Sequence, residues 1–225
     1  MATVYASSND GYVVNAQTTW NAARGGTTGS GVSTTATRST YAINTAKTAV
    51  RGGGYTFTVS RAFFQFDISG IESEVESATF KVSGYSQSGG DIIAVKATSD
   101  IATLGTNDFA RIIGFNPIGT DGSGGADMES AVTKYSDEIA SWSTSGYNDI
   151  TLTSDALSDM EDDDDLYICL MNYDYDLKDI ASTGYLSNRN GLNWTNYTGT
   201  STDPYIDYTV AVAVVDDAVF FGANF

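Results

Sequence analysis

The segment Arg61-Ala-Phe-Phe-Gln-Phe-Asp-Ile-Ser-Gly-Ile71, with Val75-Glu-Ser-Ala-Thr-Phe-Lys-Val82 after it, decides the fold class of this chain. In both segments apolar residues alternate with polar or small ones, which is the period-two pattern of a strand with one buried face. Asp67 ends the first strand, where its carboxylate is placed to cap a turn. The residues predicted to face the core are Phe64, Phe66 and Ile68 in the first strand and Ala78, Phe80 and Val82 in the second.

The rest of the chain also favours strands over helices. Further strands are predicted at 12–14, 55–59, 92–97, 148–153, 166–171 and 205–215. A short helix is predicted at 155–160, capped by Thr153 or Ser154, while 127–135 is either a short helix or a loop. Two stretches rich in small polar residues, about 25–54 and 116–126, are predicted to be long loops. We therefore predict an all-β jelly-roll β-sandwich with long loops, one or two short helices and a C-terminal tail. The sandwich is one domain, 1–217, and the tail is 218–225.

Composition excludes several classes of function. The chain has 225 residues, 28 acidic against 11 basic side chains and a net charge of −17. Such a chain repels phosphates, so neither nucleic acid nor an anionic membrane is an expected partner. No run approaches the roughly 18 apolar residues of a membrane span, and no secretory signal follows Met1. Histidine is absent, which excludes Ser-His-Asp and Cys-His catalysis and histidine metal sites. The single cysteine, Cys169, lies in an apolar run and is predicted to be buried and inert.

Two acidic segments, 161–165 and 174–179, are the candidates for an ion site, because calcium prefers carboxylate oxygens. Consecutive carboxylates point in different directions, so a solvated turn is the preferred interpretation of the first segment. The second lacks the central glycine and the later ligands of an EF-hand loop. The glycines at 52–54 and around Ser123 match no phosphate-binding loop. We therefore predict no catalytic residue, no metal site and no cofactor, and keep calcium as the alternative for the acidic segments.

Aromatic residues supply the candidate binding groups. Trp20, Trp142 and Trp194 lie near predicted loops, where they either stack on sugar rings or close the ends of the sandwich as partly buried side chains. The C-terminal tail carries Phe220, Phe221 and Phe225. An apolar tail is unfavourable in water, so it either folds back on its own domain or docks into a neighbouring chain. In the second case these phenylalanines form the partner-binding anchor.

The two opening segments resemble a known pattern, R-x-h-h-x-F-D-h-S-x-I followed by h-x-S-A-T-L-x-h, where h is apolar. This pattern is typical of DNRLRE-like and carbohydrate-binding-module-like jelly rolls. Segments 147–153 and 202–210 follow in the order seen in a group of tailed-bacteriophage proteins that share this core. The resemblance covers roughly residues 55–215. It implies that the strand of 77–82 pairs back on the strand ending at Asp67, that the protein is a virion component, and that no catalytic residue is carried over.

The functional hypothesis is a structural component of a bacteriophage virion, assembled in the host cytoplasm and not an enzyme. Packaged DNA would repel so acidic a chain, which favours the particle surface: a capsid decoration or head fibre protein, or a tail component. The expected partners are other virion proteins of the capsid or tail, further copies of this chain as a homo-oligomer, and host surface glycans. One alternative is a carbohydrate-binding module or adhesin that acts through loop aromatics, and another is a polysaccharide-degrading enzyme that uses paired carboxylates.

Overall fold

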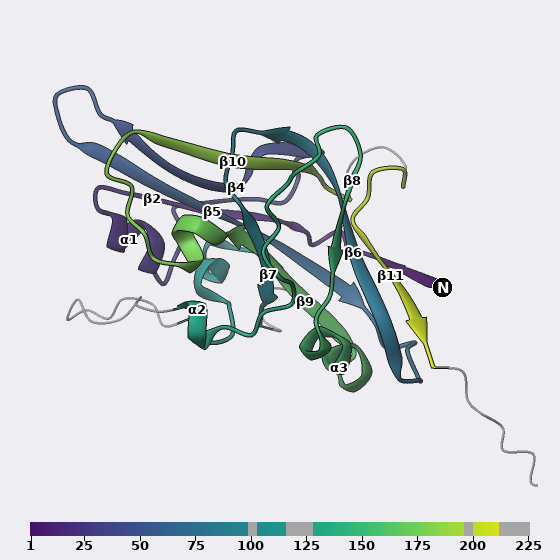
Figure 1. Ribbon diagram of the computed structural model, residues 1–225. Helices are drawn as coiled ribbons and strands as arrows, with labels where there is room; N and C mark the ends of the chain where they lie inside the picture. Colours follow the sequence, from purple (N-terminus) through teal and green to yellow (C-terminus); the bar gives the residue numbers. More distant parts are fainter. Residues whose placement is uncertain (99–102, 116–127, 196–199, 212–225) are drawn as a thin grey trace, which may run out of the picture.

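A computed structural model describes residues 1–98, 103–115, 128–195 and 200–211. They form a mostly antiparallel β structure with short helical segments (Figure 1). The strands are β1 (Ala2–Tyr5), β2 (Gly11–Gln17), β3 (Gly31–Ser33), β4 (Arg38–Ala49), β5 (Tyr55–Asp67), β6 (Val75–Gln87), β7 (Ile92–Lys96), β8 (Tyr147–Thr151), β9 (Asp165–Asn172), β10 (Leu186–Asn193) and β11 (Tyr205–Val210). The helical segments are α1 (Trp20–Gly25), the 3-10 turn η2 (Thr106–Ala110), α2 (Met128–Ala131), α3 (Ser154–Asp162) and the π-helical turn η3 (Tyr173–Leu177). The predicted all-β sandwich is confirmed.

Strand β5 is the hub of the sheet. It pairs with β2 over residues 57–63, with β4 over 55–60 and with β9 over 62–67. Because β2 overlaps both of the other two partners, β4 and β9 must lie on the same edge of β5, one after the other. The sheet therefore branches near Arg61. One branch runs through β4 and β10 to β6 and β11, and the other runs through β9 to β7.

The first core lies between the β5–β9 layer and the layer of β6, β8 and β11. Phe64 and Phe66 of β5 meet Phe80 of β6 edge to face, with ring centroids 5.1 and 5.4 Å apart. All six residues predicted to face the core are buried in this cluster. The carboxylate of Asp67 accepts hydrogen bonds from the backbone N–H and the hydroxyl of Ser69, at 3.2 and 2.6 Å, so the predicted turn cap is confirmed.

The resemblance implied that the strand of 77–82 pairs back on β5, and this pairing is wrong. Strand β6 instead hydrogen-bonds to β8, β10 and β11. It therefore lies in the facing layer and contacts β5 through side chains. The apolar residues of both strands point toward each other, which is the arrangement of a sandwich rather than of a hairpin.

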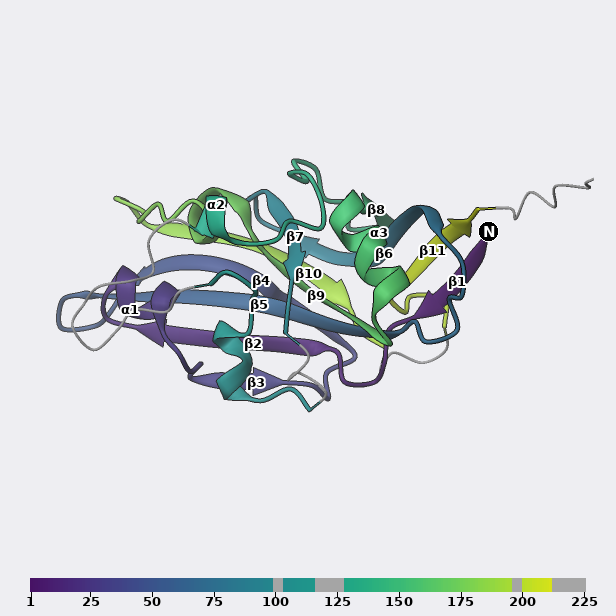
Figure 2. The same cartoon turned by 90° about the horizontal axis from the view of Figure 1, so that it is seen from below.

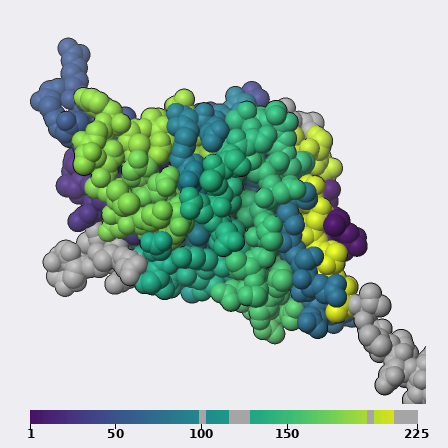
Figure 3. Space-filling model, in the orientation of Figure 1, coloured from purple at the N-terminus to yellow at the C-terminus, as the bar shows by residue number. Residues whose placement is uncertain are grey.

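A second core covers the opposite face of β5, β7 and β9. The short helical segments form a third layer there, and α1 and α2 lie below the long strands in Figure 1. The sheet contributes Val13, Val59, Phe63, Ile93, Val95, Cys169 and Met171, and the third layer contributes Trp20, Ala23, Leu104, Phe109, Ile112, Phe115, Met128, Val132 and Leu177. Segments that follow residue 128 make up much of the outer surface in Figure 3. Both faces of β5 are thus buried along its second half.

A buried ionic network joins this third layer to β5. Arg61 and Asp176 are both 0% exposed, and the guanidinium donates to both carboxylate oxygens, at 2.8 and 2.7 Å. Arg61 also donates to the backbone oxygens of Phe109 and Arg24, at 2.8 and 3.0 Å. Its guanidinium lies 4.2 Å from the ring centroid of Phe109 and 4.7 Å from that of Phe115. One side chain of β5 therefore holds α1, η2 and η3 together.

Arg24 of α1 extends the same network. Its Nε donates to the backbone oxygen of Asp176 at 2.6 Å, and its Nη1 lies 3.4 Å from the Asp179 carboxylate. Asp179 also accepts from the indole N–H of Trp20 at 2.9 Å, and it has a positive φ of 55°. Two arginines and two aspartates thus balance in charge within this region, as burial of ionised groups requires.

The predicted long loop at 25–54 is wrong over much of its length, because it contains β3 and the whole of β4. Strand β4 is stabilised by pairing along both edges, with β5 and with β10. Its segment shows little hydrophobic periodicity, so its conformation is set by pairing with β5, which follows it directly, and with the distant β10. Strands β1 and β10 and helix α1 were also not predicted. The predicted loop at 116–126, and the predicted strand beyond residue 211, lie outside the described residues.

Breaking the buried pair by Arg61→Met should lower the free energy of unfolding by about 3–5 kcal/mol, because Asp176 then keeps its charge in the core without its two donors. Urea unfolding followed by tryptophan fluorescence measures this change. The control is Lys81→Met, which breaks the exposed Lys81–Asp149 pair at 2.8 Å and should change stability by less than about 1 kcal/mol. Equal effects of the two substitutions would contradict the central role of Arg61.

The buried carboxyl group of Asp10 should make the stability of the protein depend on pH. It is 0% exposed, and it accepts from the backbone N–H and hydroxyl of Thr195 at 2.9 and 2.8 Å. Burial raises the pKa of Asp10 to about 6, with Asp203 adding to the shift. Between about pH 4 and 6 the Asp10 carboxyl is therefore protonated in the folded state but ionised in the unfolded state. Stability from this group is present below pH 4 and is lost as the pH rises through 6.

The isosteric Asp10→Asn variant should lack this contribution. The difference in unfolding free energy between wild type and variant should change by about 2–3 kcal/mol between pH 4 and 7, measured by urea titration at each pH. Asp149→Asn, at an exposed carboxylate, is the control and should give a curve parallel to wild type. If the unfolding free energies of wild type and Asp10→Asn instead changed in parallel with pH, the raised pKa of Asp10 would be refuted.

Candidate functional site

The three tryptophans proposed to stack on sugars are buried. Trp20, Trp142 and Trp194 are 6%, 6% and 1% exposed. Their indole N–H groups donate to Asp179, to the backbone oxygen of Gly191 and to Ser39, at 2.9, 3.1 and 2.9 Å. Since no ring face is free for a ligand, the glycan-stacking prediction for these residues is wrong, and they serve as packed aromatic side chains.

The other candidate residues from the sequence are the phenylalanines of the C-terminal tail and the single cysteine. Phe220, Phe221 and Phe225 lie outside the described residues, so their anchoring role stays a prediction. Cys169 is 0% exposed in the second core, as predicted. Burial raises the pKa of its thiol far above the usual value, so the thiolate is scarce at neutral pH.

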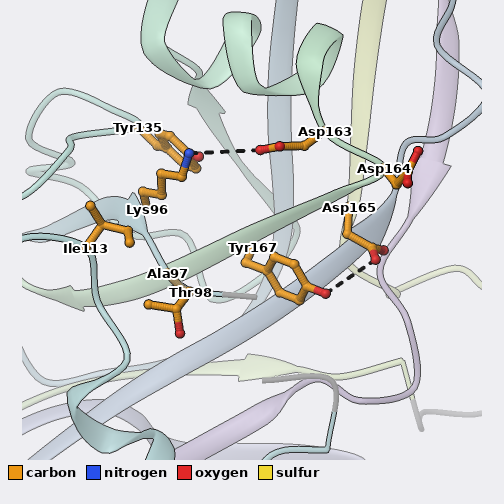
Figure 4. A pocket seen from close by; sticks show the side chains of 9 residues that line it. All are labelled: Lys96, Ala97, Thr98, Ile113, Tyr135, Asp163, Asp164, Asp165 and Tyr167. Atoms are coloured by element: carbon orange, nitrogen blue, oxygen red, sulfur yellow. Dashed lines mark hydrogen bonds and ion pairs between the residues drawn. The ribbon is translucent and has the colours of Figure 1, made fainter. Parts of the chain in front are cut away.

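The acidic segment 161–165 joins α3 to β9 and lines a cavity of about 380 Å³, shown in Figure 4. Lys96 reaches into this cavity from β7, with its Nζ 2.8 Å from the carboxylate of Asp159 and 3.9 Å from that of Asp163. The hydroxyl of Tyr135 also donates to Asp159. Residues 161–164 are exposed and Asp165 is half-buried, as expected for a solvated turn. The contacts of Lys96 and Tyr135 that hold α3 against the sheet are made mainly with Asp159, which precedes this segment.

The acidic residues of the second segment, 174–179, lie in two different environments. Asp176 and Asp179 belong to the buried arginine network, whereas the Asp174 carboxylate lies within 4.8 Å of those of Asp91 and Glu138. A hydrogen bond with Asp91 raises the pKa of Glu138. Calcium needs six to eight oxygen ligands, and this cluster offers three carboxylates, of which Asp91 and Asp174 are half-buried and Glu138 is exposed. Calcium binding at Asp174 stays a prediction.

A cleft lies on the face of the sheet formed by β10, β4, β5 and β2, which are neighbours in Figure 2. Its volume is about 390 Å³. The residues that line it are Tyr12, Val14, Tyr41, Asn44, Ala46, Thr48, Thr58, Ser60 and Ser187. The strand register places Val14, Ser60 and Asn44 side by side in one row across three strands. The cleft is therefore built by the rigid part of the fold and not by loops.

The cleft continues the core-facing side of β5. Side chains alternate along a strand, so Thr58 and Ser60 share the face of Ala62, Phe64 and Phe66. Toward the β4–β5 hairpin this face changes from phenylalanine to hydroxyl residues, and the first core ends there. The sequence alternation of Tyr55-Thr-Phe-Thr-Val59 contained this signal, but nothing in it identified the strands on either side.

Two groups at the base of the cleft have unsatisfied hydrogen-bonding capacity. Asn44 and Ser60 are 4% and 1% exposed. Within the described part of the chain, the Asn44 carboxamide oxygen and the Ser60 hydroxyl have no hydrogen-bond partner. A buried polar atom without a partner is unfavourable by about 1–3 kcal/mol, and buried polar groups are nearly always paired in native proteins. These two atoms therefore mark the cleft as the candidate functional site.

Two tyrosines line the same cleft and are held in position. The Tyr12 ring stacks on Trp194, with centroids 6.4 Å apart and an interplanar angle of 16°. The Tyr41 hydroxyl accepts from Arg189 at 3.0 Å, and the Arg189 guanidinium lies 5.1 Å from the ring centroid. Tyr41 is 48% exposed. The cleft thus combines fixed aromatic rings with amide and hydroxyl groups.

No protein-family model matches this chain, and no curated protein matches its sequence. The described helices are also too short and too polar to cross a membrane.

Thiol labelling tests the placement of Cys169. The native protein should react with 5,5′-dithiobis(2-nitrobenzoate) far more slowly than a free thiol, because the side chain is buried and its pKa is raised. One equivalent should react at once in denaturing urea. Cys169→Ala supplies the background, since the chain has one cysteine. Fast labelling of the folded protein at neutral pH would contradict the buried position.

Proposed function

We propose that this chain is a structural component of a bacteriophage particle, carried on the particle surface and bound to other particle proteins. A capsid-decoration protein, a head fibre protein and a tail component must all bind other particle proteins in this way. The proposal starts from the resemblance of residues 55–215 to tailed-bacteriophage proteins. The two motifs that carry the resemblance form strands β5 and β6, which face each other across the first core and place their phenylalanines at its centre.

The use of charge in the molecule supports a structural role. The buried ions Arg61, Arg24 and Asp176 are bonded to one another and to backbone oxygens, and they hold the third layer on the sheet. Together with Asp179, which pairs with Arg24, these ions sum to zero, so the net charge of −17 lies on the rest of the chain. It favours solubility and repels packaged nucleic acid, which suits a protein on the outside of a particle.

The observation that carries the proposal is that the molecule has two different ends. Strand β11 ends at Val210, beside β1, at one end of the molecule, and the hairpin between β4 and β5 projects from the other (Figures 1 and 2). The 13 residues of β5 extend roughly 40 Å from the hairpin toward the opposite end. The tail 218–225 follows β11 in the sequence and lies outside the described residues. We propose that the particle is bound from the β11 end of the domain, which leaves the hairpin end free.

Removing residues 218–225 should abolish incorporation into particles, because the three phenylalanines supply the apolar anchor. Quantitative mass spectrometry of purified particles should find the wild-type chain at a fixed copy number per capsid protein and the truncated chain at background. An unchanged thermal unfolding midpoint of the truncated chain would show that its domain still folds.

A double variant, Ala218→Ser with Ala223→Ser, changes the same segment but keeps its phenylalanines, and it should be incorporated normally. Undiminished copy number after truncation would eliminate the anchor. Absence of the wild-type chain from purified particles would eliminate the proposed function itself.

A further inference from the structure

We infer that the cleft on β2, β5, β4 and β10 binds a free α-amino acid. Arg189 is the partner of the ligand carboxylate, Asn44 is the partner of its ammonium group, and Ser60 supplies a further hydrogen bond. The inference goes beyond the structural role proposed above and does not depend on it, because one chain supplies every group of the site.

The first step is a row of three adjacent side chains whose buried polar atoms have no partner. Ser60 of β5 lies directly opposite Asn44 of β4, and Asn44 lies directly opposite Arg189 of β10. The Ser60 hydroxyl, the Asn44 carboxamide oxygen and Nε of Arg189 are buried, and none of them has a hydrogen-bond partner among the described residues. Directly opposite residues of an antiparallel pair place their Cβ atoms about 5 Å apart. A small ligand can therefore contact two neighbouring groups of this row at once.

The second step is the chemistry of these three atoms. Nε of Arg189 is a donor within a positively charged group, so it needs an acceptor and favours a carboxylate. The Asn44 oxygen is an acceptor, so it needs a donor. An α-amino acid carries a carboxylate and an ammonium group on one carbon atom, so it can satisfy both residues together. The Ser60 hydroxyl can donate or accept, and it can therefore bond to either group.

The third step concerns charge. Arg189 forms no ion pair with a carboxylate in the described part of the chain, although the chain has 28 acidic side chains. Its Nη1 donates to the Tyr41 hydroxyl at 3.0 Å, and a hydroxyl does not neutralise a guanidinium. The nine residues that line the cleft are uncharged, so a ligand carboxylate meets Arg189 without a competing acid. The net charge of −17 repels a plain anion, whereas an amino acid has no net charge.

The fourth step concerns the rest of the cleft. It offers apolar surface beside the polar row, from Tyr12, Tyr41, Val14 and Ala46. The Tyr12 ring is held by stacking on Trp194, and groups fixed in advance lose little conformational entropy on binding. A volume of about 390 Å³ is within the range of small-molecule sites. These features favour an amino acid with an aliphatic or aromatic side chain.

The test first uses the unmodified full chain with a series of related ligands. L-leucine, L-methionine, L-phenylalanine, L-tyrosine and L-tryptophan are screened by the thermal unfolding midpoint, and those that raise it are titrated by calorimetry. At least one should bind. Its decarboxylated amine, its deaminated acid and its N-acetyl derivative, which resembles a peptide carboxyl terminus, should each bind about tenfold or more weakly, because each lacks one of the two charged groups.

Substitutions then assign each ligand group to one side chain. Arg189→Gln should weaken binding of the amino acid about tenfold or more, and it should leave binding of the decarboxylated amine unchanged. Asn44→Leu should weaken binding of the amino acid by a similar factor, and it should leave binding of the deaminated acid unchanged. A merely structural role of either residue would weaken all of these ligands alike.

Two matched controls separate the cleft from the rest of the molecule. Arg38→Gln changes another arginine that lies over a tyrosine ring, 4.4 Å from the centroid of Tyr85 and outside the cleft lining, and it should leave binding unchanged. Thr45→Val removes another unpaired buried hydroxyl, on the opposite face of β4, and should also leave binding unchanged. Failure of all five amino acids to bind, equal binding of the amine, the acid or the N-acetyl derivative, or equal effects of Arg189→Gln and Arg38→Gln would overturn the inference.

Discussion

The bidentate pair between Arg61 and Asp176 is the interaction on which the rest of the structure depends. Arg61 stands where β5 changes partner from β4 to β9, so it occupies the branch point of the sheet. The segments it binds also pack on the sheet, where Trp20, Phe109 and Leu177 belong to the second core. Their backbone oxygens at Arg24 and Phe109 are fixed by donors of this one side chain. Arginine suits this position because its planar group offers five donors in a fixed arrangement.

The two faces of β5 explain how one strand supports three layers. The face of Val59, Arg61 and Phe63 carries the third layer, and the face of Ala62, Phe64 and Phe66 carries the facing strands. A buried ion pair is not in general more stabilising than apolar packing of the same volume. Its value here is directional: apolar contacts alone would not fix the register of the short segments, whereas four hydrogen bonds from one guanidinium do.

Sequence predicted the parts of the fold that local pattern determines. The alternation in β5 and β6 identified both strands and their buried faces, and the apolar run 166–171 identified β9. Strand β4 was missed because its segment shows little hydrophobic periodicity and because one of its two partners, β10, lies far along the chain, although the other, β5, follows it directly. Arg61 stood visibly within an apolar strand, but its partner lies 115 residues away. Position 176 looked like one more acid in an acidic segment, so the pairing was not predictable.

The cleft was hidden because its residues come from four strands, and β2 and β10 lie far in sequence from the β4–β5 hairpin that they flank. Its physical origin is nevertheless simple. Beyond Ala62 the core-facing side of β5 carries hydroxyls where phenylalanines would have extended the first core, and Asn44 stands opposite Ser60 on β4. Apolar residues at these positions would bury the same surface without an unpaired atom. A fold whose branch point is already held by the Arg61 network tolerates such a local loss of stability, and proteins concentrate such departures from good packing at sites that bind. The departure falls at the end of β5 where the layers separate, which is where the sheet alone can present a surface to a ligand.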